Sequence, residues 1–430
     1  MFNLLELRHR RQQLVSQLKQ DELIFLTAAS QCIRNGDVFY AYRQNSDFYY
    51  LTAFPEPEAI ALLTPRGKFI LFNRKEDQAV AMWEGERIGQ RRACKEYGAD
   101  DAFSIDALET NLVEYVKGAR VCYYLGDEKN NTRIVKRINK LLMRLKKTPL
   151  EYAKKLVDNL HEMRLKKSPT ELEQLRQAAY ISSKAHQRAM QACRPGLYEY
   201  QLEAELLYAF YQQGSQALAY PNIVAGGANA CILHYTKNHA PLKSGDLVLI
   251  DAGCEYNCYA SDITRTFPVN GRFNSEQKAV YQVIFDVQRA IIALIKPGVG
   301  WNQLQRCCVE WITQGLVDLG LLKGTINALI QKKSYHKFYM HGCSHWLGLD
   351  VHDVGEYRVG KKWRPLEPNM VLTVEPGIYI RPDENVDKKW WNIGIRIEDD
   401  VRVTHEGCEV LTAHAPKTIS DIEALMRASL

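Results

Sequence analysis

The chain has 430 residues, of which 46% are hydrophobic and 25% charged, and its formal net charge is +6. This is the composition of an ordinary soluble globular protein of two or three domains, large enough to fold without disulfides. No apolar run is long enough to span a bilayer and the N-terminus has no apolar signal core, so we expect a cytoplasmic protein with no membrane partner.

Cysteine usage and charge support the same compartment and argue against nucleic acid as a partner. The 11 cysteines are odd in number and scattered, which is a poor disulfide framework and typical of a reducing compartment. Basic residues cluster over 133–147, but apolar residues recur between them at helical spacing. We interpret this stretch as a solvated helix with one buried face, since no nucleic-acid recognition motif accompanies it.

The first part of the chain alternates predicted helices and strands, which is typical of a small α/β domain with a mostly parallel sheet. We expect helices over 5–20 and 78–83, and strands over 23–26, 48–51, 59–63, 69–72 and 121–125.

A strong helix start marks the change to a second domain. Ser168 is a candidate N-cap, Pro169 suits the first helical position, and Glu171 completes a capping box. We therefore place the boundary between about 150 and 168 and divide the chain into residues 1–165 and 166–430.

The second part combines long helices with antiparallel strand pairs, which indicates an α+β domain. We expect helices over 168–192, 198–213, 275–295 and 301–319, and strands over 246–252, 258–269, 370–375 and 393–403.

Two aspartates on consecutive strands form the first candidate site. A hairpin turning near 256–257 would place Asp251 directly opposite Asp262. Opposed residues in an antiparallel pair lie about 5 Å apart on one face, where two carboxylates repel unless cations sit close by. The alternative is that one aspartate caps a turn and the other lies on the surface.

A histidine cluster forms the second candidate site. His341, His345 and His352 fall within twelve residues. The His-x-x-x-His spacing is that of zinc proteases, but Gly342 follows the first histidine where the general-base glutamate of that motif would stand. Gly342 and Gly348 also disfavour a continuous helix, so this is not a zincin motif.

Two glutamates complete the set. Glu375 ends an apolar strand just before a proline, where a buried acid needs a partner, while Glu398 shares a strand face with Arg396. A surface ion pair is the alternative for Glu398 alone. Four carboxylates and one histidine form an oxygen-rich set that suits Mn²⁺ and balances two divalent cations, so we predict a dinuclear hydrolytic site.

The aspartate pair, the histidine cluster and the two glutamate motifs together resemble the pita-bread metallopeptidase family, which includes methionine aminopeptidase, prolidase and aminopeptidase P. Four motifs are most similar to bacterial aminopeptidase P in particular. The motifs are His341-Gly-Cys-Ser-His345-Trp-Leu-Gly-Leu-Asp-Val-His352, Thr373-Val-Glu375-Pro-Gly, Ile395-Arg-Ile-Glu398-Asp-Asp and Tyr42-Arg-Gln-Asn-Ser-Asp47-Phe-Tyr-Tyr-Leu-Thr. The resemblance covers the whole chain and implies a C-terminal pita-bread catalytic domain with a smaller N-terminal α/β domain of the creatinase and prolidase type.

The resemblance also implies residue roles. It makes Asp251, Asp262, His345, Glu375 and Glu398 the metal ligands, with Asp262 and Glu398 bridging both metals. It places His234, His341 and His352 beside the substrate, with Arg396 behind a bridging glutamate and Tyr379 and Tyr220 in the pocket. It also implies that Asp37 approaches the site and that Trp83 reaches a neighbouring subunit of a homo-oligomer, either a tetramer or a dimer; local packing is the alternative for Trp83.

The reaction implied is removal of the N-terminal residue from peptides with proline second, by a bridging hydroxide activated by two Mn²⁺ ions. We expect Glu375 to transfer a proton and His341 and His352 to donate to the oxyanion. The basic loop 357–365 differs from the family pattern, which puts in doubt which longer peptides are accepted.

Several alternatives remain within this resemblance. Prolidase shares the five ligands and cleaves only dipeptides, but the run from Tyr42 favours aminopeptidase P. Methionine aminopeptidase lacks so large an N-terminal domain, and a creatine-hydrolysing relative does not use this metal set. A non-catalytic binding protein on the same fold would have lost the ligands, all of which are present.

Overall fold

The computed structural model describes residues 3–126 and 133–428, and the chain divides into two compact units, Met1–Arg164 and Leu165–Leu430. Each unit has its own buried apolar core. Among the described residues, no helix is both long and apolar enough to cross a membrane.

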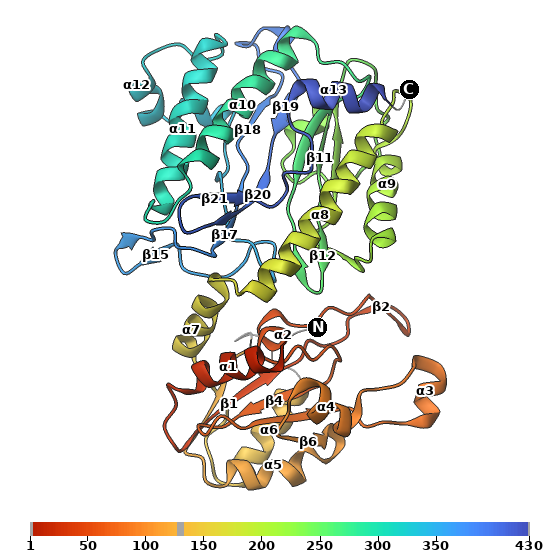
Figure 1. Cartoon of the computed structure of the whole chain (residues 1–430), viewed down its shortest axis with the longest axis vertical. Coiled ribbons are helices and arrows are strands. Elements are labelled where there is room, and N and C mark those ends of the chain that lie inside the picture. The colour runs from red at the N-terminus through yellow and green to blue at the C-terminus, as the bar shows by residue number, and fades with distance from the viewer. Residues whose placement is uncertain (1–2, 127–132, 429–430) are drawn as a thin grey trace. The chain divides into compact units, whose positions relative to one another are not determined.

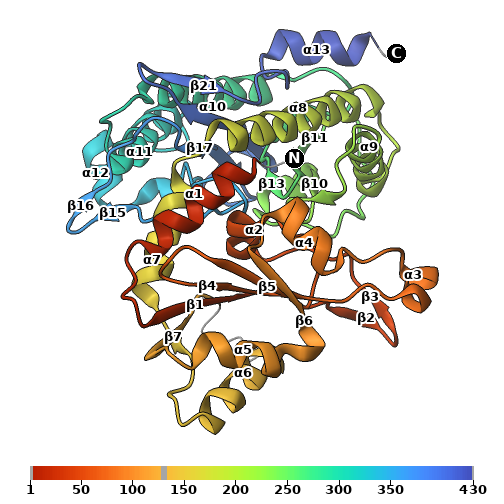
Figure 2. The ribbon, with the colours of Figure 1, turned by 60° about the horizontal axis from the view of Figure 1, so that its bottom comes forward.

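The first unit is built on a six-stranded sheet of order β6-β5-β4-β1-β7-β8. Three of its neighbouring pairs are parallel and two antiparallel, so the sheet is mixed, with the parallel pairs only just in the majority. Figure 2 shows α5 and α6 along one face and α2 and α4 along the other. The strands are β1 (Glu22–Thr27), β4 (Ile60–Leu63), β5 (Phe69–Asn73), β6 (Asp101–Ser104), β7 (Val121–Tyr124) and β8 (Glu151–Tyr152).

The strand expected over 48–51 is wrong, because these residues belong to helix α2 (Ser46–Thr52). The Asn45 side chain caps this helix by accepting a hydrogen bond from the Phe48 backbone N–H at 2.9 Å. The other helices of this unit are α1 (Leu4–Val15), α3 (Gln78–Glu84), α4 (Gly89–Tyr97), α5 (Leu108–Val116), α6 (Arg133–Arg144) and α7 (Lys154–Leu165), which ends at the boundary. A short hairpin joins β2 (Ile33–Asn35) to β3 (Val38–Phe39).

The second unit begins with α8 (Pro169–Ala192), whose predicted capping box is present. The Ser168 hydroxyl accepts from the Glu171 N–H at 3.2 Å, and the Glu171 carboxylate accepts from the Ser168 N–H at 3.0 Å. Helix α8 pairs with α9 (Glu199–Gln212), and α10 (Ser275–Leu294) pairs with α11 (Trp301–Asp318), as Figure 1 shows. Two shorter helices, α12 (Ile326–Gln331) and α13 (Ile419–Arg427), complete the set.

Each helix pair is followed by antiparallel strands that carry the acidic motifs. After α8 and α9 come β10 (Ile223–Gly226), β11 (Leu247–Asp251) and β14 (Thr264–Pro268), which form one sheet. After α10 and α11 come β17 (Val371–Val374), β20 (Asp399–Val403) and β21 (Cys408–Val410) in a second sheet, with β18 (Gly377–Ile380) and β19 (Ile393–Arg396) as a separate pair. Smaller ladders join β9 (Ala217–Leu218), β12 (Cys254–Tyr256) and β13 (Tyr259–Ala260), and also β15 (Arg358–Val359) and β16 (Lys362–Trp363).

Candidate metal centre

The strand register predicted for Asp251 and Asp262 is wrong. Asp251 at the end of β11 stands opposite Thr264, not Asp262. The strand expected over 258–269 is interrupted between β13 and β14, and a Cβ on Gly253 would lie 1.8 Å from the Ser261 carbonyl oxygen. This close backbone approach separates the β12–β13 hairpin from the β11–β14 ladder, and Asp262 lies in the irregular segment between them.

The five predicted ligands nevertheless converge on one cavity of about 260 Å³. Carboxylates at or just beyond strand ends reach it from β11, β14, β17 and β19. The lining residues include Asp251, Asp262, His345, Glu375 and Glu398, together with His234, His341, His352 and Arg396.

Three of these residues are already close enough to share one cation. Asp262, His345 and Glu398 each offer a ligand atom, and these atoms lie within 4.8 Å of one another. The His345 Nδ1 lies 2.9 Å from the Trp346 carbonyl oxygen, so it can donate there and leave Nε2 facing the acids. This is the usual arrangement of a metal-binding histidine. The His345 Nε2 lies 3.3 Å from Asp262 Oδ2 and 3.6 Å from Glu375 Oε1.

The electrostatics of the cluster also fit divalent cations. Burial raises the pKa of Glu375 to about 7, and burial followed by repulsion from Asp262 raises the pKa of Glu398 well above its usual range. Burial would lower the pKa of His345, but its hydrogen bond to Asp262 and the charge of Glu375 raise it to about 9. Buried acids with raised pKa values need nearby positive charge in order to ionise. An oxygen-rich donor set with one imidazole suits two divalent ions as the source of that charge.

One buried arginine organises the acids from behind. Arg396 donates from Nη2 to Asp251 Oδ2 at 2.6 Å, from Nη1 to the Tyr379 hydroxyl at 2.9 Å and from Nε to Thr264 Oγ1 at 3.0 Å. The Tyr220 hydroxyl lies 2.7 Å from Asp251 Oδ1 and 2.5 Å from Asp262 Oδ1. Both tyrosines thus contact the ligands or their support.

The three further histidines line the cavity in different settings. His341 Nε2 lies 2.9 Å from the Tyr379 hydroxyl and Nδ1 lies 3.6 Å from Glu375 Oε2. Burial, followed by the charge of Arg396, lowers the pKa of His341 to about 4, so it is neutral at pH 7. His352 is exposed, with its ring 4.4 Å from that of His345, and His234 is also exposed.

Two expected residues belong to the other unit. Asp37 is exposed in the turn between β2 and β3. Trp83 lies on α3 with 88% of its surface exposed, next to the similarly exposed Met82. Local packing within this unit therefore does not account for Trp83.

Two residues that hold the ligands were missed from the sequence. The Thr264 hydroxyl donates to Glu398 Oε2 at 2.6 Å while accepting from Arg396. The Asp400 carboxylate accepts the Asp262 backbone N–H at 3.1 Å. The sequence contains one signal for each residue: Thr264 is a polar residue in a buried strand, and Asp400 is an acid close to Glu398.

Comparison with known proteins decides the family. Residues 173–405 match metallopeptidase family M24, and residues 7–123 match the aminopeptidase P N-terminal domain. This chain belongs to metallopeptidase family M24. It is 44% identical to the Xaa-Pro aminopeptidase of Escherichia coli (strain K12), over 99% of this chain and 98% of that protein. It is 42% identical to the Xaa-Pro aminopeptidase of Haemophilus influenzae, over 98% of this chain and 97% of that protein.

Solved structures agree along the full length. Aminopeptidase PepP of Pseudomonas aeruginosa is 50% identical with a TM-score of 0.94, covering 100% of this chain and 99% of that chain. Aminopeptidase P of E. coli with the inhibitor Pro-Leu is 42% identical with a TM-score of 0.93 and the same coverage. These likenesses confirm the predicted family and the α+β fold, a pita-bread catalytic domain preceded by a smaller α/β domain.

Proposed function

We propose that this member of family M24 is a metal-dependent aminopeptidase that removes the N-terminal residue from peptides with proline in the second position. One observation carries the proposal: all five candidate ligands line one cavity, in a chain similar from end to end to Xaa-Pro aminopeptidases. We propose residues 1–165 as its N-terminal domain and 166–430 as its catalytic domain, which the division into Met1–Arg164 and Leu165–Leu430 supports.

The cofactor we propose is a pair of Mn²⁺ ions held by Asp251, Asp262, His345, Glu375 and Glu398. Bound there, the cations would polarise the scissile carbonyl and lower the pKa of a water molecule. Support for this assignment comes from the clustered ligand atoms and from the excess of buried acid over buried base. Hard oxygen donors favour Mn²⁺ over thiophilic metals.

The chain's own groups supply proton transfer and oxyanion stabilisation. We assign proton transfer to Glu375, which takes a proton from the attacking water and delivers it to the leaving proline nitrogen. Glu375 lines the cavity and its Oε1 lies 3.6 Å from His345 Nε2, which places the carboxylate among the proposed ligands, where the attacking water would be held. We propose His341 and His352 as donors to the developing oxyanion and His234 as a residue beside the substrate, because all three line the cavity.

Selection of proline follows from the chemistry of the scissile bond. An X–Pro amide is tertiary and has no N–H, so the pocket needs no acceptor for one. The Tyr379 hydroxyl contacts Arg396 and His341, so the fully buried Tyr379 supports two residues of the cavity wall from behind.

We also propose a cytoplasmic homo-oligomer, as a tetramer or a dimer. The eleven cysteines, all within the described part of the chain, are free thiols, which suits a reducing compartment. The exposed Met82 and Trp83 on α3 provide an apolar contact for a second copy. Light scattering measures the molar mass of the wild type and of Trp83→Ala in solution. The variant loses the proposed contact and should form smaller assemblies.

The test of function is Mn²⁺-dependent hydrolysis of Arg-Pro-Pro, beside the dipeptide Ala-Pro and the control Arg-Ala-Pro. Release of free arginine from Arg-Pro-Pro alone, abolished by chelation and by Glu398→Gln, is the expected result. Cleavage restricted to Ala-Pro would make the protein a prolidase. No cleavage of any peptide by the Mn²⁺-loaded protein would overturn the enzyme assignment and favour a non-catalytic binding protein.

A further inference from the structure

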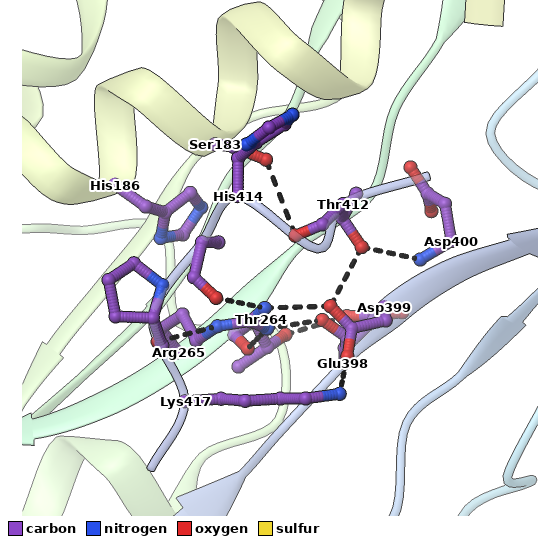
Figure 3. Close-up of polar contacts among 12 residues, drawn as sticks. Ser183, His186, Thr264, Arg265, Glu398, Asp399, Asp400, Thr412, His414 and Lys417 are labelled. Carbon is purple, nitrogen blue, oxygen red and sulfur yellow. Dashed lines mark hydrogen bonds and ion pairs between the residues drawn. The ribbon is translucent and has the colours of Figure 1, made fainter. Parts of the chain in front are cut away.

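A second buried polar cluster lies beside Glu398, one of the proposed metal ligands (Figure 3). We call it the Asp399 clamp. It joins β14, α10 and β20 to the segment that precedes α13, and it consists of Arg265, Gln288, Asp399, Thr412 and Lys417.

Arg265 is fully buried and uses all five of its N–H groups. Its Nη1 donates to the carbonyl oxygens of Thr264 at 2.9 Å and Glu398 at 2.5 Å. Its remaining donors reach Asp399 Oδ1 at 2.7 Å, the Ala415 carbonyl at 3.0 Å and the Pro416 carbonyl at 3.1 Å. One guanidinium thereby ties the backbone of Glu398 both to β14 and to the C-terminal segment.

Asp399 is the anion at the centre. Its Oδ1 accepts from Arg265 and from the Thr412 hydroxyl at 2.7 Å, and its Oδ2 accepts from Gln288 Nε2 at 2.6 Å and Lys417 Nζ at 2.5 Å. Burial would raise the pKa of Asp399, but the charges of Arg265 and Lys417 lower it below its usual range. The carboxylate therefore faces two cations and has hydrogen-bond partners on both oxygens.

The clamp also reaches Asp262, another of the proposed metal ligands. Thr412 Oγ1 accepts the Asp400 backbone N–H at 3.1 Å, and the Asp400 carboxylate accepts the Asp262 backbone N–H at 3.1 Å. Thr412 thus connects Asp399, which faces Arg265, with Asp400, which holds the backbone of Asp262.

Part of this support lies beyond the region that defines the family match. The match to family M24 ends at residue 405, whereas Thr412, Ala415, Pro416 and Lys417 all follow it. In the described part of the chain, two cations contact Asp399. Arg265 lies within the matched region, and Lys417 lies beyond it.

We propose that Lys417 and Thr412 are positioning residues for the metal centre, through which the segment 412–417 holds the backbones of Glu398 and Asp262 and so sets the affinity for divalent cations. This inference rests on the proposed function, because it takes these two acids as metal ligands. Outer-shell groups that orient ligands commonly change metal affinity without touching the metal.

The test measures Mn²⁺ binding by calorimetry on chelator-stripped protein. Lys417→Met and, separately, the near-isosteric Thr412→Val should each raise the dissociation constant about tenfold. Lys417→Arg keeps the cation and should restore most of the affinity. At saturating Mn²⁺ the KM for Arg-Pro-Pro should be unchanged in all three variants, because no residue of the clamp lines the cavity.

The matched control is Arg188→Met, which removes a surface ion pair with Glu205 between α8 and α9. It should bind Mn²⁺ as the wild type does. Wild-type affinity in both Lys417→Met and Thr412→Val would overturn the clamp while leaving the proposed function intact. Failure of the wild type itself to bind Mn²⁺ would overturn the metal centre and the clamp together.

Discussion

The neutral state of His186 makes a sharp prediction about acid stability. His186 lies on α8, fully buried, with Nε2 3.0 Å from the Ala252 carbonyl oxygen. Its Nδ1 is buried and has no hydrogen-bond partner among the described residues. Burial, opposed by the contact with Ala252 and reinforced by the charge of Arg265, lowers the pKa of His186 from 6.5 to about 4. Protonation would add a second N–H that has no acceptor.

The size and sign of the expected change in unfolding free energy follow from proton linkage. A pKa lowered from 6.5 to about 4 corresponds to about 3 kcal/mol, at roughly 1.4 kcal/mol for each tenfold change in proton affinity. Between these two pH values the unfolded chain holds a proton on His186 that the folded protein does not. The free energy of unfolding therefore carries this contribution above about pH 6.5 and loses it progressively as the pH falls towards 4.

The assay compares the wild type with His186→Gln, whose amide can still donate to Ala252 and stays neutral throughout. Urea unfolding of both metal-free proteins is followed from pH 7.5 to pH 4. Titration of every other group is common to both proteins, so the difference in unfolding free energy isolates His186. We expect this difference to shift by about 3 kcal/mol in favour of the variant as the pH falls. A difference that stays constant across this range would refute the argument.

Three further changes test the site and its frame. Arg396→Met leaves the Asp251 carboxylate buried without its cation and should destabilise the metal-free protein by about 3–5 kcal/mol in urea unfolding; a loss under about 1 kcal/mol would contradict this. Glu375→Gln removes the proposed proton carrier and should lower kcat on Arg-Pro-Pro by about 100-fold or more at saturating Mn²⁺, and a kcat near that of the wild type would rule out that role. Gly253→Ala places a Cβ 1.8 Å from the Ser261 carbonyl oxygen and should cost about 3 kcal/mol or prevent folding, so a normal melting temperature would be inconsistent with the close approach.

Local signals in the sequence predicted much of the fold, and they failed where tertiary contacts decide. The Ser168 capping box is a short-range pattern and was predicted correctly. The apolar run at 48–51 has the composition of a strand, yet it is helical. Two arginines of α1 donate to carbonyls at the end of that helix, Arg10 to Tyr50 at 2.9 Å and Arg11 to Leu51 at 2.8 Å, and this pairing over forty positions leaves no local trace.

The acidic run that follows β19 shows what limits prediction of the site. Glu398, Asp399 and Asp400 are adjacent and chemically alike, so the sequence offers no means to rank them except family likeness. Alternation along an extended chain turns the middle acid away from its neighbours. Its partners then separate the roles: Asp399 meets Arg265, which lies 134 positions away, whereas the Asp400 carboxylate holds a backbone N–H 138 positions away. Glu398 alone lines the cavity, where its pKa is raised well above the usual range by burial and by neighbouring acids. Asp399 is paired with two cations and joins β20 to its neighbours, whereas Glu398 faces the other acids of the cavity, so the role of each acid is set by partners that only the folded chain supplies.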